Sequence, residues 1–188
     1  MRSDIVPGGS FPDYELRDHS GTKRKLSELQ GADPMVLILS RGAFCPKDRE
    51  QHRLLVQMEP ELKVAYTKIV TISTDAMMEA NEMRDGLGAH WRFLIDPERT
   101  VQRDLGIIEY HNPMIPHTLV LEPGLIIYSV GPARCHREGT PRLGHHRSWS
   151  AGCVGAGRQE RVLALRHFTA RRLRRRRVRR LEIRLGKV

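Results

Sequence analysis

The chain has 188 residues, of which 39% are hydrophobic and 29% charged, a length that suits one ordinary domain with an appendage. It holds no apolar stretch long enough to span a membrane, no apolar signal segment at its start and too few cysteines for a disulfide scaffold, so we expect a cytoplasmic protein. The net charge of +10 is unevenly placed: residues 1–130 carry 15 Lys and Arg against 19 Asp and Glu, whereas residues 131–188 carry 17 against 3. The sequence therefore predicts one domain over residues 1–130, followed by an arginine-rich tail over residues 131–188.

Strand and helix patterns alternate from residue 34 onward. Residues 34–40 form a continuous apolar run, which is typical of a strand buried on both faces. Residues 46–66 carry Leu and Met side chains at helical spacing and predict a long helix, in which Pro60 favours a kink. Residues 68–74 are rich in β-branched side chains and predict the next strand.

The alternation continues after residue 74. Residues 75–88 predict a helix that is capped by Asp75. The remaining predicted elements are a strand at residues 91–96, a short helix at 97–106 and a hairpin at 117–130 that turns at Pro123 and Gly124. This order predicts an α/β sheet with parallel strands and an antiparallel edge. In it we expect Trp91 and Phe93 in the core, and Met77, Met78 and Met83 as core or interface residues.

Cys45 stands where the strand at residues 34–40 gives way to the long helix. Ligands of open α/β sheets collect at the carboxyl ends of strands, and a helix N-terminus favours a thiolate over a thiol. Pro46 suits the first turn of a helix, and Arg41 and Lys47 add positive charge. This position predicts a nucleophilic cysteine with a pKa below its ordinary value. The alternative is that Cys45 is a small buried hydrophobic residue.

Three blocks of the sequence, in this order, resemble the redoxin group. They are "PGGSFPDYELRDHSGTKRKLSEL…PMVLILSRGAFCP", "VTISTDAMMEANEMRDGLGAHWRFLIDPERTVQRDLGI" and "MIPHTLVLEPGLIIYSV". The group comprises peroxiredoxins of the alkyl hydroperoxide reductase and thiol-specific antioxidant type, within the thioredoxin-like superfamily. The resemblance covers about residues 7–130. It implies a thioredoxin-like fold, a central mixed sheet flanked by helices, with the irregular basic tail after it.

The resemblance makes Cys45 the redox-active, peroxidatic cysteine. The supporting positions that it implies are Phe44 as the aromatic residue before the cysteine, Pro46 and Asp48 in place of "C-P-x-E", Pro116 as the cis-proline, and His117 and Thr118 beside the pocket.

The chain also departs from the family pattern. Peroxiredoxins usually carry a threonine three residues before the cysteine, where this chain has Gly42. They also carry an arginine near the later strand, where this chain has Pro116 and His117, and Asp48 removes the "C-x-x-C" of thioredoxins. We hypothesise that Arg41 or His117 replaces the missing cation.

Two functions follow from these observations. In the first, the Cys45 thiolate attacks a peroxide, becomes a sulfenic acid and is reduced by an external thiol, without a cofactor. The partners are then a peroxide, a thioredoxin-like or small thiol reductant and, if the disulfide is intermolecular, a second copy of the chain. In the second, a non-catalytic thioredoxin-like domain uses the basic tail to bind nucleic acid or an acidic partner.

The tail adds two further hypotheses. Cys135 follows the hairpin closely and is a candidate resolving thiol, whereas the Cys and His residues of the tail do not have the spacing of a zinc site, so no metal is expected. Residues 131–188 contain 16 Arg but no Asp, Asn, Tyr or Met, a composition that GC-rich DNA read out of frame would produce. A polybasic arm that binds phosphates nonspecifically is the alternative.

Overall fold

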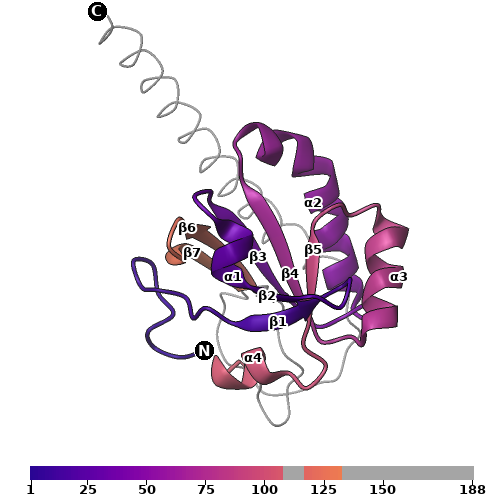
Figure 1. Ribbon diagram of the computed structural model, residues 1–188, viewed down its shortest axis with the longest axis horizontal. Helices are drawn as coiled ribbons and strands as arrows, with labels where there is room; N and C mark the ends of the chain where they lie inside the picture. Colours follow the sequence, from indigo (N-terminus) through magenta and orange to yellow (C-terminus); the bar gives the residue numbers. More distant parts are fainter. Residues whose placement is uncertain (108–116, 133–188) are drawn as a thin grey trace, which may run out of the picture. The chain divides into compact units, whose positions relative to one another are not determined.

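The structure, a computed structural model, describes residues 1–107 and 117–132 (Figure 1). The chain divides into two units after Pro132, and the described residues belong to the first of them. Pro116, Cys135 and the rest of the arginine-rich tail, which includes Cys153, lie outside the described residues.

Seven strands form one mixed sheet in the order β2-β1-β5-β4-β3-β6-β7. The strands are β1 (Glu15–Asp18), β2 (Lys23–Lys25), β3 (Met35–Ser40), β4 (Lys68–Ser73), β5 (Arg92–Ile95), β6 (His117–Glu122) and β7 (Ile126–Pro132). The helices are α1 (Leu26–Gln30), α2 (Pro46–Val64), α3 (Met77–Leu87) and α4 (Thr100–Asp104). Strands β3, β4 and β5 are parallel, and the other pairs are antiparallel. The predicted α/β sheet with an antiparallel edge is confirmed.

The helices cover both faces of the sheet, α2 and α3 on one and α1 and α4 on the other (Figure 1). Two right-handed crossovers that move in the same direction place their helices on one face, which accounts for α2 and α3. On the opposite face Leu26 of α1, Val101 of α4 and Leu105, which directly follows α4, are fully buried in the main hydrophobic cluster. All six residues of β3 are buried, so this strand lies in the middle of the layers, as its apolar run predicts.

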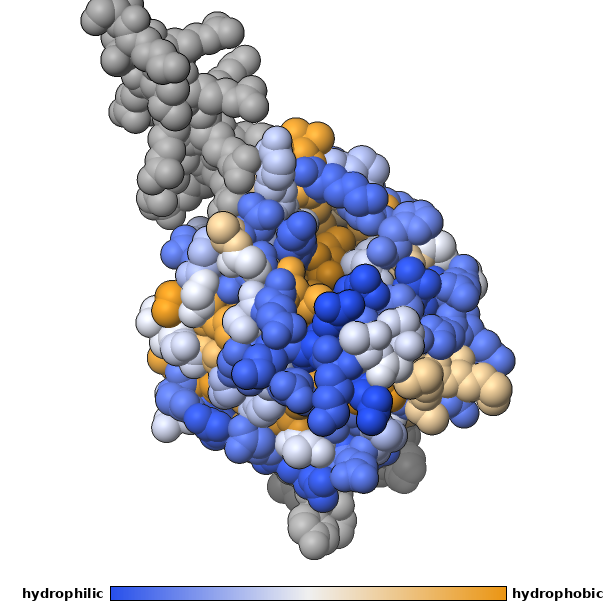
Figure 2. Space-filling view, in the orientation of Figure 1, coloured by the Kyte–Doolittle hydropathy of each residue, from blue (hydrophilic) through white to orange (hydrophobic). Residues whose placement is uncertain are grey.

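Most predicted core residues are buried. Trp91 and Phe93 are 6% and 0% exposed, and Met83 is 5% exposed. Met77 and Met78, however, are exposed, because α3 begins at Met77 and its first turn faces solvent. Met77 and Met78 are therefore not core residues, and their alternative assignment as interface residues stays a prediction. Figure 2 shows a hydrophobic patch at this end of α3, on a face that is otherwise mostly hydrophilic.

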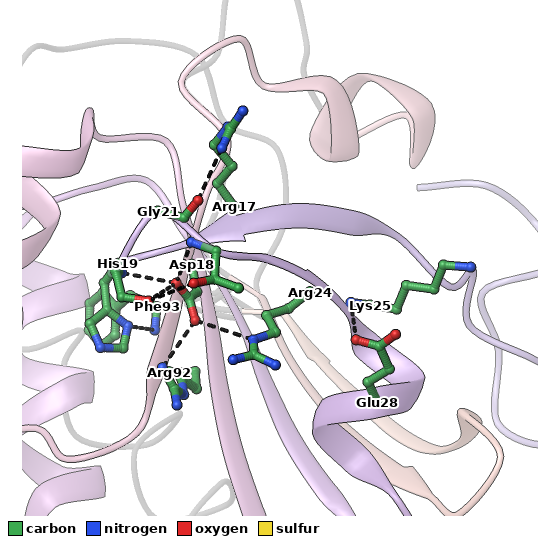
Figure 3. A network of polar contacts seen from close by, with 11 residues as sticks. Arg17, Asp18, His19, Gly21, Arg24, Lys25, Glu28, Arg92 and Phe93 are labelled. Atoms are coloured by element: carbon green, nitrogen blue, oxygen red, sulfur yellow. Dashed lines mark hydrogen bonds and ion pairs between the residues drawn. The ribbon is translucent and has the colours of Figure 1, made fainter.

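A buried carboxylate at the end of β1 links this strand to the edge strand β2 and to β5 (Figure 3). Asp18 is fully buried, and its Oδ1 accepts hydrogen bonds from Ser20 N (2.9 Å), Ser20 Oγ (2.6 Å) and Thr22 N (3.1 Å). Its Oδ2 accepts from Arg92 Nη1 at 3.0 Å and lies 3.6 Å from Arg24 Nε. Burial alone would raise the pKa of Asp18, but the hydrogen bonds and the charge of Arg92 hold it below its ordinary value.

Among the described helices, none has both the length and the apolar character that crossing a membrane requires.

Candidate active site

Cys45 is the residue that precedes the first turn of α2. Strand β3 ends at Ser40, a four-residue loop follows, and the Cys45 N–H donates to the carbonyl of Gly42 at 3.1 Å. The Cys45 carbonyl in turn accepts from Arg49 N at 3.1 Å, which starts the helix. Pro46 occupies the first turn, where its missing N–H has no helical partner to lose. The cysteine thus lies at the carboxyl end of a central strand and the N-terminus of a 19-residue helix.

The Cys45 thiol has a raised pKa, so the expectation of a lowered value is wrong. The residue is only 4% exposed, and burial, which disfavours the thiolate, is the largest cause of the shift. The side chain of Asp48 raises the pKa further, through its charge and by accepting a hydrogen bond from the thiol. The N–H groups of Lys47 and Asp48 favour the thiolate, as expected of a helix N-terminus, but they do not outweigh the burial.

Asp48 is a fully buried carboxylate in the first turn of α2, next to the thiol. Its Oδ2 accepts a hydrogen bond from Arg41 N at 3.0 Å, whereas Oδ1 is buried without a hydrogen-bond partner of ordinary geometry. Burial raises the pKa of Asp48 to about 6, against the opposing effects of the Arg41 N–H, the Cys45 thiol and the Arg41 charge. A carboxyl group of this kind changes its protonation near neutral pH.

Asp75 holds the loop between β3 and α2 rather than the helix that follows it. Its Oδ2 accepts hydrogen bonds from Ala43 N (2.8 Å) and Ser73 Oγ (2.9 Å). Helix α3 begins one residue later, after Ala76, and has no side-chain cap. The predicted role of Asp75 as a helix cap is therefore wrong, because its carboxylate binds a backbone N–H that lies 32 residues earlier in the sequence.

Arg41 and Phe44 lie on the rim of the site. The Arg41 guanidinium carbon lies 5.4 Å from the centroid of the Phe44 ring, which is a cation–π distance. Phe44 is 66% exposed, and Thr74 Oγ1 donates to the Arg41 carbonyl at 2.7 Å. The charge of Arg41 lowers the pKa of Asp48. Whether Arg41 or His117 also replaces the family's missing cation stays a prediction.

The start of β6 places Thr118 and His117 on opposite faces of the sheet. Thr118 pairs with Ile38 of β3, and its Oγ1 accepts a hydrogen bond from Gln51 of α2. His117 pairs with Leu39, whose side chain belongs to the hydrophobic cluster on the other face. The structure therefore brings Thr118 to the helix that carries Cys45 and turns His117 toward the other face.

Sequence reasoning missed His52, which is fully buried on α2 one turn after Asp48. Its Nδ1 donates to the Asp48 carbonyl at 2.7 Å, since a carbonyl can only accept. Its Nε2 then accepts from Thr71 Oγ1 at 3.1 Å, and the same hydroxyl accepts from Trp91 Nε1 at 3.0 Å. Burial lowers the pKa of His52 to about 4, so the imidazole is neutral. Its spacing of four from Asp48 and seven from Cys45, on one helix face, is the signal that would have found it.

Within residues 1–107 and 117–132, Cys45 is an unpaired thiol. No group of three or more His, Cys, Asp or Glu side chains in the same ranges is arranged to hold a metal ion.

Comparison with solved structures supports the thioredoxin-like fold. The peroxidoxin BcpB from Mycobacterium tuberculosis is 24% identical, with a TM-score of 0.62 over 66% of this chain and 84% of that chain. Peroxiredoxin 6 of Arenicola marina is 18% identical, with a TM-score of 0.59 over 66% of this chain and 63% of that chain. The bacterioferritin comigratory protein of Xanthomonas campestris is 18% identical, with a TM-score of 0.58 over 68% and 84%.

Comparison with sequences gives the family. No curated protein matches this sequence significantly. The profile of the AhpC/TSA family matches residues 7–130, a span that contains β3, Cys45, α2 and nearly all of the β6–β7 hairpin. The chain therefore belongs to the AhpC/TSA family of thiol-dependent oxidoreductases.

Proposed function

We propose that this protein reduces peroxides with Cys45 as the nucleophile. The observation that carries the proposal is the position of this thiol, between the carboxyl end of β3 and the N-terminus of α2, inside the span that matches the AhpC/TSA family. A thiolate formed there accepts hydrogen bonds from the N–H groups of Lys47 and Asp48. Membership of a thiol-dependent family and this geometry support the same chemistry.

The reaction oxidises the sulfur and reduces the peroxide. The Cys45 sulfur attacks the terminal oxygen of ROOH, the S–O bond forms as the O–O bond breaks, and the alcohol ROH leaves after gaining one proton. An external thiol R′SH then attacks the sulfenic acid and releases water, which leaves a mixed disulfide. A second thiol reduces this disulfide and restores the Cys45 thiol. We place this cycle in the cytoplasm, where thiol reductants are abundant.

The neighbouring residues have supporting roles in this proposal. Pro46 starts the helix that presents Cys45. The half-buried Arg41 and the exposed Phe44 form the rim that a peroxide or reductant meets first. The Gln51–Thr118 hydrogen bond joins α2 to β6. Whether Cys135 or a second copy of the chain resolves the oxidised cysteine stays a prediction.

The test is peroxide-dependent thiol oxidation by the full chain. Hydrogen peroxide and a small organic hydroperoxide are supplied with dithiothreitol, and the sulfenic acid is trapped with dimedone and located by peptide mass. We expect consumption of peroxide and a dimedone adduct on Cys45. Cys45→Ser abolishes both, whereas the matched variants Cys135→Ser and Cys153→Ser keep the adduct. Equal activity in Cys45→Ser and the natural chain refutes the assignment.

A further inference from the structure

The structural contacts of the carboxylate beside Cys45 do not account for its burial. Asp48 is fully buried, yet only Oδ2 is used to hold the backbone, through the Arg41 N–H at 3.0 Å. Oδ1 is left without a partner of ordinary geometry, although burying an unpaired carboxylate oxygen is costly. The thiol of Cys45 interacts with this same carboxylate.

We infer that Asp48 is a catalytic residue, the base that takes the proton of the Cys45 thiol and the acid that returns it to the leaving oxygen. The inference rests on the proposed peroxide reduction. It assigns the reacting oxygen as Oδ1, because Oδ2 is engaged by Arg41 N.

Protons and electron pairs balance in this step. The S–H bond of Cys45 breaks, its proton moves to Asp48 Oδ1, and the electron pair stays on sulfur. The thiolate attacks the terminal oxygen of ROOH, so that the S–O bond forms while the O–O bond breaks. The departing RO⁻ takes the proton from the Asp48 carboxyl group and leaves as ROH. Cys45 ends as a sulfenic acid and Asp48 as a carboxylate.

A catalytic base explains how a thiol with a raised pKa can react at neutral pH. A thiol that is 4% exposed and beside a carboxylate holds its proton at neutral pH, and the thiolate is the reactive form. A base in direct contact removes the proton only when the peroxide is in place. The N–H groups of Lys47 and Asp48 then stabilise the thiolate as it forms.

The charged and titratable groups around Asp48 come from three elements. Cys45 precedes the same helix, Arg41 follows β3 and lowers the pKa of Asp48, and Asp75 follows β4 and raises it. His52 contacts the Asp48 carbonyl from within α2 and is neutral. With a pKa of about 6, Asp48 is a carboxylate at pH 7 and is ready to accept a proton.

Two rates measured on the same full-length chain test the inference between pH 5 and 8.5. One is the oxidation of Cys45 by hydrogen peroxide, trapped with dimedone. The other is alkylation of Cys45 by iodoacetamide, which needs the thiolate but no proton return. The variants are Asp48→Asn, which keeps an acceptor for Arg41 N, Asp48→Glu, which keeps a base, and the exposed control Asp85→Asn. Circular dichroism verifies the fold of each.

We expect the loss of the Asp48 carboxylate to change the two rates in opposite directions. Oxidation of the natural chain falls on acidification with a midpoint near pH 6, where Asp48 gains a proton. In Asp48→Asn that midpoint disappears and oxidation at pH 7 slows at least about tenfold. Alkylation of the same variant becomes faster, because the carboxylate that raises the thiol pKa is gone. Asp48→Glu recovers the acidic midpoint, and Asp85→Asn changes neither rate.

Two outcomes overturn the inference, and they differ. Oxidation in Asp48→Asn that is as fast as in the natural chain, or faster, means that Asp48 only raises the thiol pKa, and peroxide reduction by Cys45 still stands. A natural chain in which Cys45 gains no dimedone adduct refutes the proposed function, and the role of Asp48 with it.

Discussion

The carboxylate of Asp75 fills the space into which a side chain at position 42 would project. A Cβ atom added to Gly42 would lie 2.2 Å from Asp75 Oδ1 and 2.8 Å from its Cγ, both well inside van der Waals contact. Gly42 also has a φ of +112°, which side-chain-bearing residues rarely adopt. The family's usual threonine is therefore incompatible with this loop, in which Asp75 binds the backbone N–H of Ala43 before Cys45.

A double-mutant cycle checks this relationship. We expect Gly42→Ala to lower the free energy of unfolding by about 2–4 kcal/mol, because it adds a clash to the backbone strain. In an Asp75→Ala background the same change costs at least about 1 kcal/mol less, since the clashing carboxylate is gone. Urea denaturation gives all four values. The control is Gly88→Ala. Gly88 has a φ of +66°, and a Cβ added there would meet no atom within 4 Å, so we expect no coupling between this change and Asp75→Ala. Strict additivity of Gly42→Ala and Asp75→Ala rules out the contact.

The hydrogen bonds of Asp18 predict a large loss of stability when this residue is replaced. Replacing Asp18 with Ala leaves the N–H groups of Ser20 and Thr22 and the Arg92 guanidinium without their acceptor. We expect unfolding to become easier by about 2–4 kcal/mol. The matched variant Asp85→Ala removes a 2.8 Å ion pair whose carboxylate is 70% exposed, so we expect a change within about 1 kcal/mol. Similar losses in the two variants, measured in urea, contradict the structural role of Asp18.

Two buried groups of α2 give opposite pH dependences of stability. His52 has its pKa lowered from 6.5 to about 4, so the unfolded chain binds the proton more readily and stability is lost as the pH falls through this window. Asp48 has its pKa raised from 3.8 to about 6, so the folded chain binds the proton more readily and stability is lost as the pH rises through that window. Each contribution is at most about 3 kcal/mol.

Single variants expose these opposed contributions. Between pH 6 and 4, acidification destabilises Asp48→Asn relative to the natural chain, because the gain from protonating Asp48 is removed. Over the same range it stabilises His52→Gln relative to the natural chain, because the cost of keeping His52 neutral is removed. Denaturation at closely spaced pH values gives both differences. Parallel curves for all three proteins mean that neither group is shifted.

The buried thiol predicts slow alkylation in the native state. We expect iodoacetamide to modify Cys45 at pH 7 at least about tenfold more slowly in the native chain than in urea, and the native rate to keep rising beyond pH 9. Peptide mass assigns the adduct to Cys45, and the same peptide in the unfolded chain is the internal control. A native rate at pH 7 that equals or exceeds the unfolded one is incompatible with a raised pKa.

The elements that sequence patterns predicted are those with a strong apolar signal. Strand β3 is a continuous apolar run and α2 has a regular apolar face, so the position of Cys45 between them followed directly. Strands β1 and β2 and helix α1 were missed because they have four, three and five residues, with many charges and no long period.

The wrong predictions for the site have a common cause, which is contact between residues that are distant in the sequence. The helix N-terminus at Cys45 was read correctly, but burial by the rest of the fold reversed the direction of the pKa shift. Asp75 stands where a helix cap is usual, yet a backbone N–H from the loop before α2 takes its carboxylate. Local propensity contains neither of these contacts.

The strand order has a consequence for how the chain folds during synthesis. The central strand β3 pairs with β4 soon after both are made, but its other neighbour, β6, begins only at residue 117. The first strand β1 likewise waits for β5, which begins at residue 92. In a nascent chain that ends before the β6–β7 hairpin, one edge of the mostly apolar strand β3 is thus unpaired and is a template for pairing with other chains. The sheet can complete its native strand pairing only when the hairpin has left the ribosome. The native contacts therefore join residues far apart in the sequence, and folding is completed late.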